Sequence, residues 1–171
     1  MRLITLILAL AFAAPASAQA PSDFRQEFLG QFNNSAAKFE ALAEAMPEQA
    51  YDWRPAEGVA SVVEVLMHVA RYNYLYPDQN LGMGSPVEYA GWEAEITDKE
   101  EAMETLIASM DHVRSALGAM SDDELDEPTM LYGRQVGSWA VMLQLVAHMN
   151  EHLGQSIAYA RMNGVVPPWS R

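Results

Sequence analysis

The segment that decides the fold reads VMLQLVAHMNEHLGQSIAY over residues 141–159. Apolar side chains and histidines recur in it at alternating steps of four and three, which is the spacing of a helix packed inside a bundle. The inward face of this helix consists of Val141, Leu145, His148, His152, Gln155 and Tyr159. The pattern therefore predicts a core helix that carries two histidines, one turn apart, on its buried face.

Buried imidazoles need partners, because an unpaired polar group removed from water costs about 1–3 kcal/mol. Residues at i and i+4 have Cβ atoms about 5–6 Å apart, so one cation can bind both His148 and His152. Two ligands are too few, and the third candidate is His68, which lies inside the apolar run of residues 62–69. A single core histidine is more often structural, but three imidazoles with an open position are the arrangement of catalytic zinc.

Two polar residues could support these ligands. Gln155 lies one turn beyond His152 and can orient a ligand ring. Glu64 lies one turn before His68 and could accept a hydrogen bond from it, although a helix-capping role explains Glu64 equally well. Glu151 flanks the ligand face and could serve as a general base at its rim, although a position in solvent is expected.

The fourth histidine, His112, is expected at the surface, because it lies beside Asp111 and Arg114 and off the apolar stripe of its helix. A zinc-protease motif needs Glu directly after the first histidine. Met149 stands there, so a zinc protease is not expected.

Four amphipathic helices are expected, and no strand pattern competes with them. They cover residues 22–46, 61–76, 97–120 and 138–163. Ser61 and Glu64 form a capping box for the second helix, as Thr97 and Glu100 do for the third. Ser138 caps the fourth. The connection 77–96 contains Pro, Gly and aromatic residues and is expected to pack as a cover. The sequence predicts an all-α four-helix bundle.

Residues 1–18 read as a secretory signal peptide, followed by one domain over residues 19–171. Arg2 precedes an apolar run from Leu3 to Phe12, and Ala16-Ser17-Ala18 is a small-residue cleavage pattern. The apolar run is shorter than the about 20 residues that span a bilayer. A soluble protein, periplasmic or secreted, is expected.

Composition limits the kinds of metal ligand and binding partner that are expected. The chain has no cysteine, so a metal site here must use His, Asp or Glu. Its formal net charge of −13 argues against nucleic acid and anionic membranes as partners. Small molecules or cations fit this charge better, and a solvated acidic surface explains it as well. A homodimer is left open.

Several motifs together resemble the DinB/YfiT-like metalloenzyme family over nearly all of residues 19–171. They are His68 in a buried second helix, residues 148–155, the run Trp-Arg-Pro-Ala-Glu-Gly at 53–58, and Arg-Met-Asn-Gly at 161–164. The resemblance implies an up-down-down-up bundle and a divalent metal, zinc or nickel, on His68, His148 and His152. The family's usual basic residue after the last ligand is Leu153 here, which puts a charged substrate contact there in doubt.

Three functions remain open at this point. Relatives in the family include thiol-dependent transferases and maleylpyruvate isomerases, so one reading is a metal-dependent transferase or hydrolase whose small-molecule substrate includes a thiol. A second reading is a non-catalytic protein that binds or senses a metal or small ligand. A third is a structural bundle with a functionless site. An accessible fourth coordination position favours the first.

Overall fold

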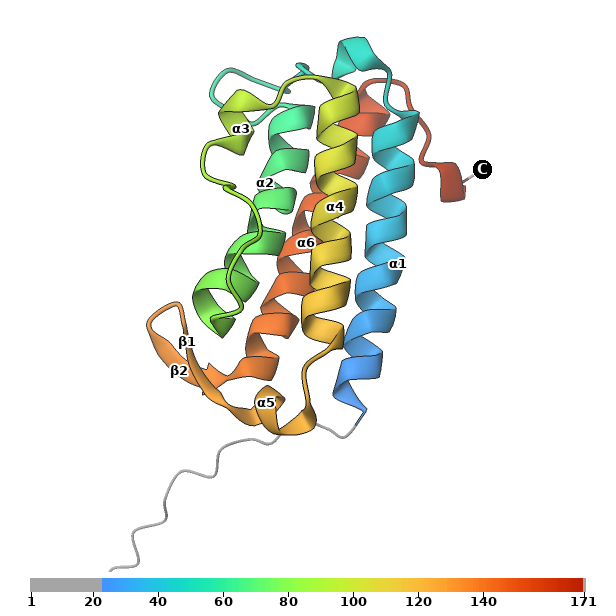
Figure 1. Ribbon diagram of the computed structural model, residues 1–171. Coiled ribbons are helices and arrows are strands. Elements are labelled where there is room, and N and C mark those ends of the chain that lie inside the picture. The colour runs from blue at the N-terminus through green and yellow to red at the C-terminus, as the bar shows by residue number, and fades with distance from the viewer. Residues whose placement is uncertain (1–22, 171) are drawn as a thin grey trace, which may run out of the picture.

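The computed structural model describes residues 23–170, which form an elongated helical bundle (Figure 1). The signal peptide expected over residues 1–18 lies outside the described residues. The elements are α1 (Phe24–Ala45), η1 (Glu48–Ala50), α2 (Val62–Leu75), η2 (Tyr76–Asn80), α3 (Trp92–Glu95), α4 (Lys99–Gly118), α5 (Asp122–Asp126), β1 (Pro128–Leu131), β2 (Arg134–Gly137), α6 (Ser138–Met162) and η3 (Pro168–Ser170).

The four long helices have the up-down-down-up order that the family resemblance implied. In Figure 1, α1 and α6 run in one direction, and α2 and α4 run in the other. Helix α1 packs mainly against α6, and α2 packs mainly against α4, so each parallel pair is a pair of neighbours. Helix α2 also contacts α6. The prediction of an all-α four-helix bundle is confirmed.

Side chains from all four long helices fill the core. Phe32 from α1, Met67 from α2, Met110 from α4 and Met142 from α6 are fully buried. Burying a side chain of this size stabilises the fold by about 1.5–3 kcal/mol. On α6, Val141, Leu145, His148 and Tyr159 of the predicted inward face are buried, as the periodicity of that segment indicated.

A polar contact lies inside the interface between α2 and α4. The side-chain amide of Asn73 donates to Ser109 Oγ at 3.0 Å, and Ser109 Oγ donates to the carbonyl of Leu106 at 2.7 Å. Both polar side chains are buried. Because an unpaired polar group is costly there, this contact favours one register between the two helices.

The helix ends follow the sequence only in part. The capping box at α2 is confirmed, with Ser61 N–H donating to Glu64 at 2.6 Å and Glu64 N–H donating to Ser61 Oγ at 3.3 Å. The predicted Thr97–Glu100 box is wrong, because Asp98 caps α4 by accepting from Glu101 N–H at 3.1 Å.

The predicted cap at the start of α6 is also wrong. Gly137 precedes this helix without a side-chain cap. The Ser138 hydroxyl instead donates to the carbonyl of Glu127 at 3.0 Å. Ser138 therefore ties α6 to the preceding segment rather than capping it.

The expectation of no strands is wrong for residues 128–137, where β1 and β2 form an antiparallel hairpin. Its two-residue turn has positive φ at Tyr132 (49°) and Gly133 (75°), the geometry of a type I′ turn. A tyrosine in this conformation is unusual, and its hydroxyl lies 2.5 Å from that of the buried Tyr76. This tertiary contact supports a turn that local sequence did not indicate.

The connection between α2 and α4 packs over the bundle, as expected of a cover. It contains η2 and the short helix α3, which lies beside α2 (Figure 1). Gly91 begins α3 with a φ of 91°, and a Cβ there would lie 2.8 Å from Glu95 Oε1. The Trp92 ring packs edge-on against Tyr74, with centroids 5.5 Å apart.

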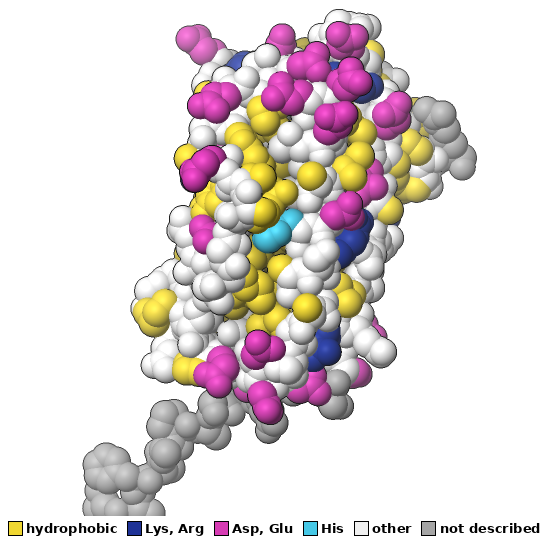
Figure 2. All heavy atoms as spheres, viewed as in Figure 1, with side chains coloured by type: hydrophobic (Ala, Val, Ile, Leu, Met, Phe, Trp, Pro, Cys, Tyr) yellow, Lys and Arg dark blue, Asp and Glu magenta, His cyan; other side chains and the backbone are white. Residues whose placement is uncertain are grey.

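The outer surface carries the negative charge of the chain. On the face shown in Figure 2, acidic side chains gather mainly near the two ends of the bundle, with an apolar band between them. Among the helices of residues 23–170, none has the length and apolar character needed to cross a membrane.

Candidate metal centre

Three histidines meet between α2 and α6. His68 comes from α2, and His148 and His152 come from successive turns of α6. One ring nitrogen of each residue lies within 4.8 Å of those of the other two. His148 is buried, with 9% of its surface exposed, whereas the other two rings are half-buried. The structure therefore brings together the three residues that the sequence singled out.

The hydrogen bonds of His68 determine where its proton lies. Its Nδ1 is 3.3 Å from Oε1 of Glu93, and the same oxygen accepts from Arg71 at 3.0 Å. An ionised carboxylate can only accept hydrogen bonds. Nδ1 of His68 is therefore the protonated nitrogen, and the lone pair of Nε2 faces the cluster.

A chain of hydrogen bonds determines the tautomer of His152 in the same way. The Tyr159 hydroxyl donates to the carbonyl of Ala60 at 3.1 Å, so it accepts from Gln155 Nε2 at 2.9 Å. The amide oxygen of Gln155 then faces His152 Nδ1, 2.9 Å away, and accepts from it. His152 is thus protonated at Nδ1, and its Nε2 is free for a ligand bond.

The third ring, His148, lies deepest. Its Nε2 is 3.2 Å from Nε2 of His68. The ring packs against Tyr72 with centroids 4.5 Å apart and edge-on against Tyr76 at 5.9 Å. Tyr72 also contacts His68, with centroids 4.6 Å apart, so this tyrosine packs against two rings of the cluster.

The surroundings favour the neutral forms of His148 and His68. Burial, followed by the neighbouring His152 and His68 rings, lowers the pKa of His148 to about 3. Burial and the nearby His152 also lower the pKa of His68, although Glu93 opposes this shift. Neutral imidazoles are the form that binds a metal.

Glu93, the acceptor for His68 Nδ1, remains ionised. Burial raises the pKa of Glu93, but a hydrogen bond from its own backbone N–H and the contact with Arg71 outweigh burial and lower it. Glu93 therefore acts as an acceptor over the neutral pH range.

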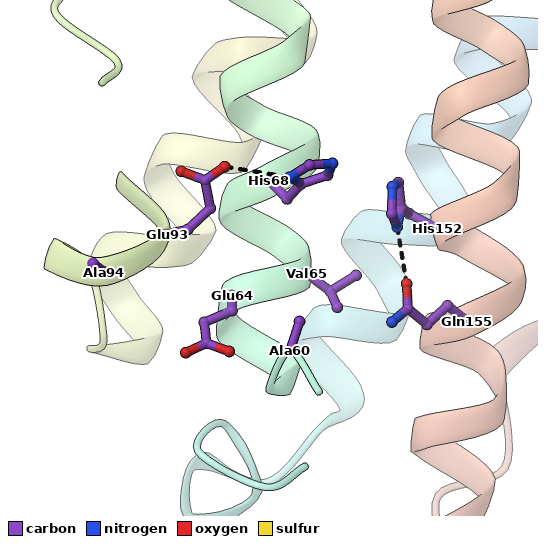
Figure 3. Close-up of a pocket in the computed structure, with 8 residues that line it drawn as sticks. All are labelled: Ala60, Glu64, Val65, His68, Glu93, Ala94, His152 and Gln155. Atoms are coloured by element: carbon purple, nitrogen blue, oxygen red, sulfur yellow. Dashed lines mark hydrogen bonds and ion pairs between the residues drawn. The ribbon is translucent and has the colours of Figure 1, made fainter. Parts of the chain in front are cut away.

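A pocket of about 370 Å³ opens beside the cluster (Figure 3). It is lined by Ala60, Glu64, Val65, His68, Glu93, Ala94, His152 and Gln155. Glu93 points at His68 from α3, and Gln155 points at His152 from the next turn of α6 (Figure 3). A small molecule in this pocket would reach the faces of two of the three imidazoles.

The predicted supporting residues differ in their roles. Gln155 contacts a cluster histidine, as described above. Glu64 lines the pocket, but its carboxylate bonds to Ser61 and to Arg54, at 3.1 Å from the guanidinium. The hydrogen bond from Ser61 N–H, together with Arg54, lowers the pKa of Glu64. Glu64 is therefore a cap and ion-pair partner, and Nδ1 of His68 contacts Glu93 instead of Glu64.

The expectation for the fourth histidine needs adjustment. His112 lies apart from the cluster, as predicted, but it is half-buried rather than on the wet side of α4, because it stacks on Tyr74 with centroids 4.5 Å apart. Its Nε2 is enclosed without a hydrogen-bond partner among the described residues. Leu153 is buried in the core, whereas Glu151 is exposed, as expected.

Sequence reasoning missed Glu93, Arg71 and Tyr159 as parts of the site. Glu93 lies 25 residues from His68 on the connection 77–96, and no spacing rule relates the two. Tyr159 was on the predicted inward face, and its step of four from Gln155 could have indicated the contact.

The structure is a helical bundle with three clustered histidines beside a pocket, the class of a candidate metal-binding bundle. Comparison with known families shows the family to which the chain belongs. Residues 31–160 match the DinB superfamily. The chain belongs to the DinB superfamily. A comparison with curated protein sequences finds no match.

Solved structures show the same fold. A DinB-like protein from Bacillus cereus superposes with a TM-score of 0.75 at 16% identity, covering 84% of this chain and 95% of that one. A DinB-like protein from Bacillus subtilis gives 0.66 at 20% identity, with 82% and 93% covered. A conserved protein from Enterococcus faecalis gives 0.67 at 17% identity, with 80% and 94% covered. At these identities the likeness extends to the fold alone.

Proposed function

We propose that this protein is a metal-dependent enzyme that binds one divalent ion, zinc or nickel, through His68, His148 and His152. The observation that carries the proposal is the meeting of three ring nitrogens within 4.8 Å beside an open pocket. The chain shares the DinB superfamily fold with its structural relatives. The assignment of the three histidines as ligands of one ion is our proposal.

The donor set fits this kind of ion. Three imidazoles suit zinc and nickel, whereas Mg²⁺ and Ca²⁺ prefer oxygen ligands. Two of the rings, His68 and His152, keep an unprotonated Nε2 for a metal, because Glu93 and Gln155 accept from their Nδ1 atoms. Acceptors of this kind are usual behind metal-bound histidines. When bound, the ion would act as a Lewis acid that favours deprotonation of a thiol or water.

The residues of the chain would supply binding and orientation. The pocket of about 370 Å³ fits a small molecule. Val65 and Ala94 offer apolar contacts to its carbon skeleton. The two pocket carboxylates, Glu64 and Glu93, are each paired with an arginine, so the charge of this wall is largely compensated. We infer a small thiol as one substrate, in a transfer to an electrophile, with hydrolysis of a small molecule as the related reaction.

The test compares thiol binding and turnover in zinc-loaded protein, chelator-treated protein and a His68→Ala variant. We expect 2-mercaptoethanol to bind zinc-loaded protein by calorimetry and ethylene glycol to bind much more weakly. Thiol transfer to 1-chloro-2,4-dinitrobenzene, in which a C–S bond forms, chloride leaves and the thiol proton goes to solvent, should require zinc. Equal thiol affinity with and without zinc would reject the proposal.

One observation favours a second function, a non-catalytic protein that binds or senses a metal or small ligand. Both pocket carboxylates are engaged, Glu64 by Ser61 and Arg54, and Glu93 by His68 and Arg71. Neither is a free general base. Tight, zinc-dependent thiol binding without turnover on several electrophiles would favour this second function.

We also propose that the protein is exported to the periplasm or medium after cleavage behind Ala18. The charged start, short apolar run and Ala16-Ser17-Ala18 support this proposal. Mass spectrometry of the secreted or periplasmic protein should find Gln19 at its amino terminus. Exported material that retains Met1 would contradict it.

A further inference from the structure

The carboxylate of Glu93 links the cover of the pocket to the histidine cluster. Its Oε1 lies 3.3 Å from His68 Nδ1 and 3.0 Å from a guanidinium nitrogen of Arg71. Both partners belong to α2, whereas Glu93 belongs to α3. Arg71 also lies over the Tyr72 ring, 5.3 Å from its centroid. One oxygen thus holds two side chains of a neighbouring helix.

The other anchors of helix α3 include Trp92 within it and the buried Ile96 directly after it. The helix has four residues, none of them buried, and it begins at Gly91 in the left-handed region. The edge-on contact of Trp92 with Tyr74 holds one side of it. A helix this short is not stable by itself, so contacts with α2 determine whether it docks. Glu93 and Ala94 then form part of the pocket wall.

A purely structural ion pair is the simpler explanation of the Glu93–Arg71 contact. A partly buried ion pair of this type stabilises the fold only modestly, and it would have no consequence for the cluster. The contact of the same carboxylate with His68 changes this expectation. Because the carboxylate only accepts, its contact with His68 places the proton on Nδ1 and leaves Nε2 free. Without Glu93, the proton could occupy either nitrogen, and the ring could rotate.

We propose that Glu93 is a positioning residue that couples metal binding at His68 to the docking of α3 over the pocket. This inference rests on the proposed three-histidine site. Such linkage is reciprocal: whatever factor the docked Glu93 adds to metal affinity, bound metal adds to the docking equilibrium. Substrate would therefore meet a more closed pocket in the metal-loaded protein.

The test uses full-length protein with three substitutions. Glu93→Ala removes the acceptor, and Glu93→Gln keeps a neutral acceptor of the same size. Glu95→Gln is the matched control, because it removes a carboxylate from an exposed position of the same short helix. Zinc affinity is measured by competition with a chelating dye, and amide hydrogen exchange is followed over residues 81–98 with and without zinc. Long-range ¹⁵N–¹H spectra of chelator-treated protein report the His68 tautomer.

We expect Glu93→Ala to weaken zinc binding about 10–100-fold, as loss of a residue behind a ligand usually does. Glu93→Gln should fall between Glu93→Ala and wild type, and Glu95→Gln should match wild type. Zinc should slow exchange over residues 81–98 in wild type but not in Glu93→Ala. The Nδ1–H form of His68 should dominate in wild type and become mixed in Glu93→Ala.

Wild-type affinity and wild-type exchange in Glu93→Ala would overturn the coupling. Failure of the proposed function has a different signature, since wild-type protein would then bind no zinc. In that case the tautomer spectra still decide the positioning role: an unchanged His68 tautomer in Glu93→Ala would reject it.

Discussion

Nε2 of His68 and Nε2 of His148 lie 3.2 Å apart, although 80 residues separate them in the chain. The Tyr72 ring contacts both imidazoles, with centroid distances of 4.6 Å to His68 and 4.5 Å to His148. The close approach depends on the packing of α2 beside α6 and on the enclosing tyrosine. Folding of the bundle therefore assembles the cluster.

Acidification should destabilise the chelator-treated protein through His148. Its pKa is about 3 in the folded chain and about 6.5 when unfolded, so the unfolded chain binds more protons between these values. The contribution of neutral His148 to the free energy of unfolding is fully present above about pH 6.5. It is lost as pH decreases toward 3, by at most about 1.4 kcal/mol per pH unit. Urea unfolding followed by circular dichroism measures it. His148→Gln should show a shallower pH dependence, and an identical slope would contradict the account.

Replacing Gln155 should weaken metal binding without unfolding the bundle. Gln155→Leu removes the acceptor for His152 Nδ1, and we expect zinc affinity to fall about 10–100-fold. Gln155→Glu keeps an acceptor oxygen and should retain most of the affinity. Chelator competition measures both variants. If Gln155→Leu binds zinc as wild type does, the Gln155 contact has no part in positioning the ring.

The polar contact between α2 and α4 should matter for stability alone. Ser109→Ala leaves the buried Asn73 amide without its oxygen partner, which should cost about 1–3 kcal/mol. The measurement is the free energy of unfolding in urea. Zinc stoichiometry should be unchanged, because Asn73 lies outside the histidine cluster. A neutral effect on stability would show that Asn73 finds another partner.

The fold was predictable because each long helix carries its own apolar period. The steps of four and three that end at Tyr159 needed no knowledge of the other helices, and the same holds for Phe32 and Phe39 in α1. The hairpin was not predictable in this way. Tyr132 adopts a conformation that usually requires Gly, Asn or Asp, and its hydroxyl contact with Tyr76 comes from a distant helix.

In the candidate site, too, contacts within one helix were predictable and contacts between distant segments were not. His148, His152 and Gln155 share one helix face, so their proximity followed from helical spacing. Glu93 could not be found in this way, since its contact with His68 depends on how the connection 77–96 folds back on α2. Glu64 shows the opposite case, because the local capping contact with Ser61 prevailed over a role at the cluster.

The most direct test of the three-histidine site is the zinc content of purified protein after loading and removal of unbound metal, measured by elemental analysis. Wild type should retain about one ion per chain, and His68→Ala, His148→Ala and His152→Ala should retain far less. His112→Ala is the matched control: it should keep its zinc, although loss of the contact with Tyr74 should lower its stability. A wild-type protein that retains no zinc, or a His148→Ala variant that retains it while His112→Ala does not, would contradict the site.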